Sequence, residues 1–132
     1  MKIKNILLMG VIAVIGFLGF TNVNAASISD NGKYSLVLSS NDWDCSFDGE
    51  YTKIIRFNVS EGETTVKISE LTKDVVPYNG KNEFSHWENN AGQKVDELKV
   101  SDFTFSGNFY TSQGKEINYT NGLVIKATFE GK

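Results

Sequence analysis

Glycine turns at regular intervals are the feature that most limits how this chain can fold. Each turn separates two apolar stretches, and the turns are Asn31-Gly32, Asp48-Gly49, Asn79-Gly80, Ala91-Gly92 and Asn121-Gly122. Asparagine or aspartate before glycine favours a tight turn between neighbouring strands. The chain has 12 glycines and only one proline, so glycine rather than proline marks most of its turns. This pattern predicts a domain built mainly of short β-strands.

Alternation of apolar and polar residues locates the strands between these turns. It is clearest over residues 123–130, and it recurs over 34–39 and 55–59; weaker strands are expected at 84–88 and 98–105. Ile68, Leu71 and Val75 instead recur at spacings of three and four, with Ser69 able to cap the first turn and Pro77 blocking continuation. We therefore predict an α+β fold, mostly β, with one short helix. An all-β sandwich is the alternative.

The first 25 residues have the layout of a secretory signal peptide. Lys2 and Lys4 precede an apolar run at 6–20, and small residues ending at Ala25 supply a cleavage site. The run has fifteen residues, fewer than the roughly 20 that a membrane-spanning helix needs, so a retained anchor is the weaker alternative. We expect residues 1–25 to be removed, leaving 26–132 as a single β-rich extracellular domain with no transmembrane segment. The protein would be secreted or loosely associated with the cell wall.

The charge of the exported part disfavours nucleic acid as a partner. Removal of Lys2 and Lys4 lowers the 13 basic residues to 11, against 16 acidic ones, a net charge of about −5. A nucleic-acid module would need a basic stripe to neutralise phosphates. An extracellular protein or a cell-wall or host glycan is the expected partner.

Cys45 is the only cysteine, so no disulfide can form within the chain. A buried, apolar role for its side chain is the preferred interpretation. A disulfide linking Cys45 of two chains is the alternative.

The order of residues from 54 to 129 resembles the Listeria–Bacteroides repeat, a β-grasp-like B-repeat of internalin-type and other bacterial surface proteins. The residues that carry the resemblance are Gly80, Phe84, Trp87, Gly92, Ala127 and Phe129. The chain departs from the family pattern with Glu88 directly after Trp87 and with an insertion-like stretch at 102–120. The resemblance implies a β-grasp-like domain and a role in adhesion or as a spacer. Phe84 and Trp87 are expected in the core, whatever the family.

An acidic segment with interleaved aromatics, residues 41–50, together with the Tyr51 that follows it, is the strongest candidate for a binding surface. Trp43, Phe47 and Tyr51 are its candidate ligand-binding residues, because aromatic side chains offer much contact area for few ordered rotamers. Asp44, Ser46 and Asp48, followed by Gly49, match the start of a calcium loop. Ile55 stands where the closing bidentate glutamate should be, so a solvated turn with Trp43 and Phe47 partly packed is the stronger interpretation, and no cofactor is required.

Catalysis has little support in the sequence. His86, the only histidine, and Cys45 could in principle form a base and nucleophile, but neither lies in a recognisable signature. We therefore expect a non-enzymatic recognition or adhesion module. A spacer domain without a ligand, or a small secreted toxin or inhibitor, is the alternative.

Overall fold

The computed structural model describes residues 25–42 and 44–131. The predicted signal peptide up to residue 24 and the candidate ligand-binding residue Trp43 lie outside the described residues. Within the described ranges, no helix has both the length and the apolar composition needed to cross a membrane.

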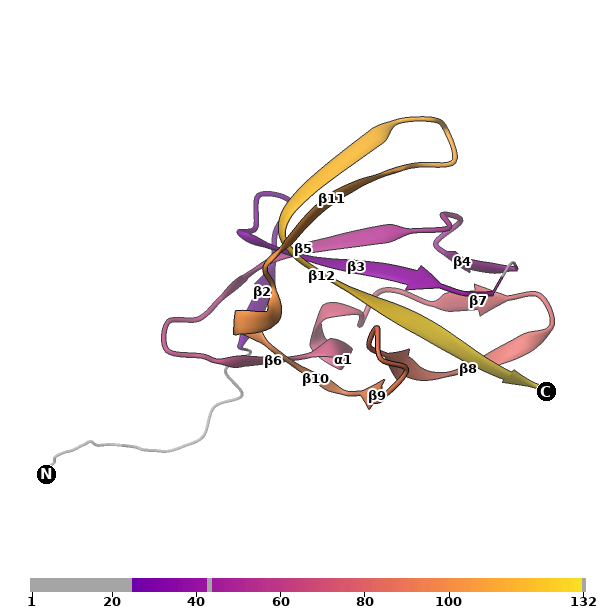
Figure 1. Ribbon diagram of the computed structural model, residues 1–132, viewed down its shortest axis with the longest axis horizontal. Helices are drawn as coiled ribbons and strands as arrows, with labels where there is room; N and C mark the ends of the chain where they lie inside the picture. The colour runs from indigo at the N-terminus through magenta and orange to yellow at the C-terminus, as the bar shows by residue number, and fades with distance from the viewer. Residues whose placement is uncertain (1–24, 43, 132) are drawn as a thin grey trace, which may run out of the picture.

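The described chain is mostly β with one short helix, as the turn pattern predicted (Figure 1). Its strands are β2 (Ala26–Ile28), β3 (Tyr34–Ser40), β4 (Cys45–Phe47), β5 (Lys53–Val59), β6 (Thr65–Lys67), β7 (Pro77–Asn79), β8 (Asn82–Glu88), β9 (Lys94–Val95), β10 (Glu97–Lys99), β11 (Phe105–Tyr110) and β12 (Glu116–Gly131). The helix α1 spans Ile68–Leu71, and a single 3₁₀ turn spans Val100–Asp102.

One curled sheet organises the molecule, with strand order β2-β5-β3-β12-β8-β9. β3 is antiparallel to β5 and parallel to β12, and β12 is antiparallel to β8. The first part of β12 pairs with β11 instead, and the two form a curled ribbon that extends from the rest of the sheet (Figure 1). Two smaller pairs, β4 with β7 and β6 with β10, complete the structure.

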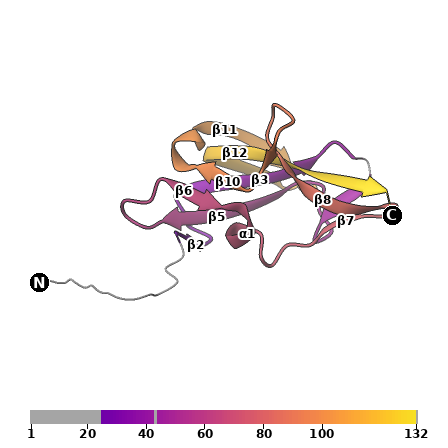
Figure 2. The same cartoon turned by 90° about the horizontal axis from the view of Figure 1, so that it is seen from below.

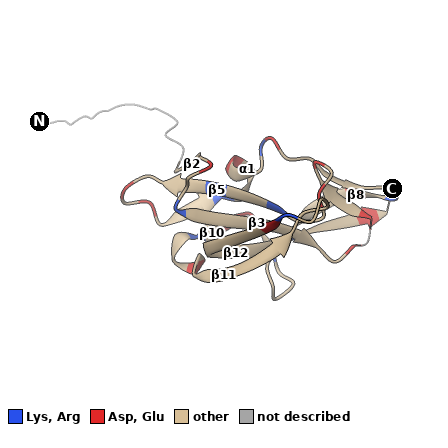
Figure 3. Ribbon diagram, turned by 90° about the horizontal axis from the view of Figure 1, so that it is seen from above, with Lys and Arg blue, Asp and Glu red and all other residues tan. Residues whose placement is uncertain are grey.

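The alternating residues place the core on one face of this sheet. Leu36, Leu38, Ile55, Phe57 and Ile125 are buried there, and they pack with Ile68 and Leu71 of α1. Figures 2 and 3 show α1 on this face and the β11–β12 ribbon on the other. The strands predicted at 34–39, 55–59 and 123–130 are thus confirmed.

Of the two aromatic residues expected in the core, only Trp87 is fully enclosed. Its ring is buried, whereas Phe84 is 37% exposed and lies at the rim of the core, against Trp87 and Phe129. The pairing of β8 with β12 shifts by one residue between these two positions, and Ser85 is left over. The extra residue lets Phe84 and Trp87 lean on each other although they are three positions apart in one strand.

The predicted short helix is present as a single turn that ends at Leu71, after which Thr72 leaves the helical conformation and its hydroxyl donates to the Ile68 carbonyl. Two details of the local predictions were wrong. Ser69 does not cap this helix, since the helix continues directly from the extended Lys67 of β6. The strand expected at 98–105 is broken by the 3₁₀ turn, so its two ends belong to different strands, β10 and β11.

The prediction of a turn between two strands at Asn121-Gly122 was also wrong, because both residues lie within β12. Asn121 has a positive φ of 48°, and the Tyr119 ring covers the space beside Gly122, where an added Cβ would lie 2.5 Å from a ring carbon. At this point β12 exchanges β11 for β3 as its neighbour. The dipeptide therefore marks a bend in one strand rather than the end of two.

Polar contacts hold the β11–β12 ribbon against the second face of the sheet. The Arg56 guanidinium of β5 donates to the Asn118 carbonyl at 3.0 Å. Near the ribbon tip, the Glu50 carboxylate accepts from the Ser112 N–H at 2.9 Å and from its hydroxyl at 3.0 Å. Ser35 and Val37, which point to this second face, are both buried. The sheet is therefore covered on both sides.

Candidate functional site

A cleft of about 470 Å³ lies where β3 ends and the acidic segment begins. Besides Cys45, its lining residues are Ser39, Ser40, Asn41, Asp42, Tyr51 and Thr52. Five of these carry a hydroxyl or an amide, one of them on the aromatic ring of Tyr51, and the sixth carries a carboxylate. The cleft thus combines several hydrogen-bonding groups with one aromatic surface.

Hydrogen bonds fix the two sides of this cleft. On one side, the Ser40 hydroxyl donates to the Ala127 carbonyl of β12 at 3.0 Å and accepts from the Asp42 N–H at 3.1 Å. This anchors the start of the segment to the central parallel strands. On the other side, Phe47 and Glu50 exchange two backbone hydrogen bonds of 2.7 and 3.1 Å across a tight turn. The turn leads directly into Tyr51.

Positive φ angles explain the sequence of that tight turn. Asp48 has φ of 54° and Gly49 φ of 90°, conformations that aspartate tolerates and glycine adopts without strain. The Asp-Gly dipeptide therefore forms the turn that the sequence predicted, and its geometry sets the direction in which Tyr51 leaves β4.

Phe47 belongs to the core and not to a ligand-binding surface, which corrects that part of the predicted site. Its side chain is 0% exposed, and its ring stacks on that of Trp87 with centroids 6.0 Å apart. Pairing of β4 with β7 carries Cys45 and Phe47 inward, since alternate residues of a strand point to the same face. An aromatic residue in an acidic segment is thus buried by a partner strand thirty residues later.

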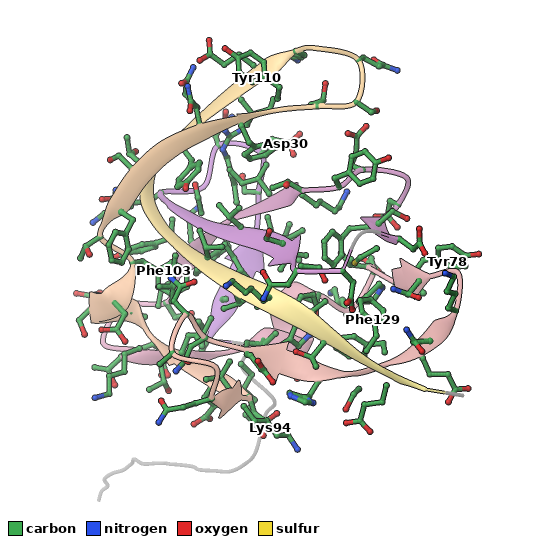
Figure 4. The ribbon with its side chains drawn as sticks, turned by 45° about the vertical axis from the view of Figure 1, so that its right-hand side comes forward. Asp30, Tyr78, Lys94, Phe103, Tyr110 and Phe129 are labelled. Atoms are coloured by element: carbon green, nitrogen blue, oxygen red, sulfur yellow. The ribbon has the colours of Figure 1, made fainter. Side chains whose placement is uncertain are left out.

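Tyr51 is the one predicted aromatic that is described and exposed, with 70% of its surface in contact with solvent. Other exposed aromatics lie elsewhere: Tyr78 on β7 is 61% exposed, and Tyr110 stands on the β11–β12 ribbon (Figure 4). Neither of them lines the cleft at the end of β3. Among the described residues, Tyr51 is therefore the aromatic side chain that a ligand in this cleft would meet.

The three predicted calcium ligands differ in their surroundings, and one of them already forms an ion pair. Asp44 is exposed just before β4, Ser46 lies within β4 opposite Tyr78, and the Asp48 carboxylate is 3.2 Å from the Lys53 ammonium. In the described ranges, no group of three histidine, cysteine, aspartate or glutamate side chains is arranged to hold a metal ion. The ion pair with Lys53 means that Asp48 already has a counter-charge.

Cys45 is a free thiol, 3% exposed, on the inner side of the cleft. Desolvation by burial raises the pKa of this thiol, and the Asp42 carboxylate raises it further, while the Ser40 hydroxyl acts in the opposite direction. The side chain thus has the buried role preferred from the sequence. A disulfide to a second chain would require this part of the protein to open, because the residue is almost completely enclosed.

His86 bonds to carboxylate and hydroxyl groups of the β8–β12 pair and not to Cys45. Its Nε2 lies 2.8 Å from a Glu88 oxygen and its Nδ1 2.8 Å from the Ser85 hydroxyl, which itself donates to Glu130 at 2.8 Å. The Ser85 hydroxyl therefore lies between the Nδ1 atom of His86 and the Glu130 carboxylate.

Three polar lining residues were not singled out from the sequence: Ser39, Ser40 and Thr52. They are small, common surface residues, and only the folding of β3 beside the Phe47–Glu50 turn brings them together. Acidic and basic residues are interspersed around the molecule (Figure 3). Comparison of the chain with protein-family models, curated proteins and solved structures finds no match.

Proposed function

We propose that this protein is a secreted, non-enzymatic recognition module that binds an extracellular glycan in the cleft at the end of β3. The observation that carries the proposal is the cleft itself, in which hydroxyl, amide and carboxylate groups surround one exposed tyrosine. Export is supported by the sequence of residues 1–25.

The chemistry of the lining favours a glycan over a flat protein surface. Sugar hydroxyls both donate and accept hydrogen bonds, and Asn41, Asp42 and Thr52 offer the matching acceptors and donors. The Tyr51 ring can cover the apolar face of a sugar while its hydroxyl stays in water. A side chain or tail of a protein partner is the other ligand that a concave site of this size would admit.

We further propose that the fold is β-grasp-like and related to the Listeria–Bacteroides repeat. Supporting observations are the parallel central pair β3 and β12, the antiparallel strands β5 and β8 beside them, and α1 between β5 and β8 in sequence. The residues of the resemblance also meet across one strand pair, since Ala127 lies opposite Trp87 and Phe129 opposite Phe84. A spacer role without a ligand, or a small toxin or inhibitor, would use the same framework without the cleft.

Binding of the exported protein to cell-wall polysaccharide and to an array of host glycans tests the function. Tyr51→Ser should weaken binding at least about tenfold, in the range of a binding hot spot, with an unchanged melting transition. Tyr78→Ser removes an equally exposed tyrosine outside the cleft and should leave binding intact. Trp43→Ala tests the rest of the acidic segment.

Equal losses from the Tyr51 and Tyr78 substitutions would argue against the cleft as the site. Retention of a protein partner, lost on Tyr51→Ser, would keep the site and change the ligand class. Absence of any saturable partner among glycans and proteins would favour the spacer role.

A further inference from the structure

The backbone nitrogen of Ala26 points away from the sheet. Ser60 donates to the Ala25 carbonyl at 2.8 Å and Ser29 donates to the Arg56 carbonyl at 2.9 Å, so these pairs are the hydrogen-bonded ones of the antiparallel β2–β5 ladder. Hydrogen-bonded and non-bonded pairs alternate, which makes Ala26 and Val59 a non-bonded pair. Since β2 is the last strand at its side of the sheet, the Ala26 nitrogen faces the open edge.

A cavity of about 650 Å³ separates this edge from α1 and the turn after it. Ala26 and Glu70 both line it, together with Lys73 and Asp74. Ala26 is only 9% exposed, so the start of β2 is enclosed.

Glu70, one of the residues that line this cavity, has an oxygen that lacks a partner. Its Oε1 atom is completely buried and makes no hydrogen bond, and among the described residues the two ion pairs are Lys53 with Asp48 and His86 with Glu88. A buried carboxylate oxygen without a donor is costly, so proteins normally supply one. Among the described residues, Lys73 lines the same cavity but forms no ion pair with Glu70.

We propose that cleavage between Ala25 and Ala26 supplies the missing cation, and that the new α-ammonium group of Ala26 pairs with the Glu70 carboxylate. The inference rests on the export proposed above. In the cleavage, water adds across the peptide bond: residue 25 leaves with a carboxylate, and the Ala26 nitrogen becomes a positively charged group with three N–H donors. A neutral amide at the sheet edge is thus converted into a partner for the buried oxygen.

Removal of the signal peptide would therefore exchange one hydrogen bond for an ion pair. The Ser60 N–H loses the Ala25 carbonyl, whereas the bond from Ser29 to Arg56 remains and keeps β2 on β5. The mature β2 is then fixed at both ends, by Ser29 in the sheet and by Glu70 across the cavity. A chain that begins at Ala26 would therefore be more stable in its folded state than a chain that begins at Ala25.

Urea unfolding of four proteins at pH 6 tests this assignment. Two begin at Ala26 and two retain Ala25, and one of each pair carries Glu70→Gln. The added Ala25 restores a sheet hydrogen bond, so without the ion pair it should be neutral or stabilising. We expect it instead to lower the folding equilibrium constant at least about threefold when Glu70 is present, and not to lower it in Glu70→Gln, a coupling typical of paired groups.

Equal effects of Ala25 in both backgrounds would overturn the proposal, as would an exported protein whose N-terminal sequence does not begin at Ala26. Lys73→Gln, which removes the other cation lining the cavity, should leave the effect of Ala25 unchanged. If Glu70→Gln does not fold, Glu70→Asp replaces it, and the shorter carboxylate should reduce the effect of Ala25. This experiment measures stability and not glycan binding. A result that overturns the ion pair therefore does not argue against the proposed glycan site.

Discussion

Replacing Phe47 with alanine distinguishes a core residue from a ligand-binding one. The side chain is fully buried and stacks on Trp87. Its removal gives up a transfer free energy of about 2 to 3 kcal/mol and leaves a cavity that the sheet cannot fill completely. The expected loss of unfolding free energy is about 3 to 5 kcal/mol.

This loss is large for a domain of this size. Unfolding free energies of native domains are about 5 to 15 kcal/mol, so a loss of about 3 to 5 kcal/mol is at least about a fifth of the stability of any domain in this range. For a chain of about 100 residues each kilocalorie shifts the melting temperature by about 4 to 8 °C, which predicts a decrease of at least about 12 °C. Urea titration followed by tryptophan fluorescence measures the change, because the ring contacts Trp87 directly.

Tyr51→Ala in the same segment is the matched control. Its side chain is exposed, and we expect a change within about 0.5 kcal/mol. A Phe47→Ala protein whose unfolding free energy stays within about 1 kcal/mol of the parent, but which cannot bind ligand, would refute the assignment of Phe47 to the core and restore it to the recognition surface.

Two further predictions concern the thiol and a glycine. Because burial raises the pKa of Cys45 in the folded state, stability should be complete below the unfolded thiol value of about 8.5 and should fall as the pH rises above it; urea midpoints at about pH 7 and about pH 9.5 should show this decline in the parent but not in Cys45→Ala. A decline of equal size in both proteins would assign it to other groups. Gly32→Ala would place a Cβ 2.3 Å from the Phe57 backbone nitrogen and should lower the unfolding free energy by about 1 to 3 kcal/mol in thermal melts. Gly80→Ala, whose nearest neighbour would lie 4.0 Å away, should have little effect, and equal melting temperatures for the two variants would contradict the reasoning.

Period-two alternation was sufficient to predict the strands that line the core. Leu36, Phe57 and Ile125 each lie in a segment whose apolar residues recur at every second position, and all three are buried. Burial on one face of a sheet imposes this pattern directly on the sequence, so local patterns suffice there. The parallel pairing of β3 with β12 has no comparable local signal, because it depends on residues almost ninety positions apart.

Turn chemistry was a less certain guide. Asp48-Gly49 does form a tight turn, but Asn121 adopts a similar positive φ inside a continuous strand. The difference lies in the strands that flank each dipeptide. Residues before Asp48-Gly49 pair with β7, whereas the residues on either side of Asn121-Gly122 belong to one long strand and pair with different neighbours. A residue with a positive φ lets the backbone change direction. The strands that pair with its flanking residues determine whether the result is a tight turn or a bend within one strand.

The candidate site was predictable only in part. Tyr51, one of the aromatic residues proposed for ligand binding, is exposed, whereas Phe47 is fully buried and not merely packed in part as the sequence suggested. Phe47 is drawn inward by β7, a strand that no local pattern links to it. The polar residues at the end of β3 become a lining only once the Phe47–Glu50 turn stands opposite them.

The length of β12 has a consequence for the order in which the molecule can assemble. Its 16 residues serve in turn as the partner of β11, β3 and β8. Until this segment is present, a growing chain can form the β3–β5 hairpin but has nothing to join it to β8. Pairing partners so distant in sequence also makes closure slow. Under the proposed export, the chain would therefore lack its complete sheet until almost all of it had crossed the membrane, and the sheet would form outside the cell.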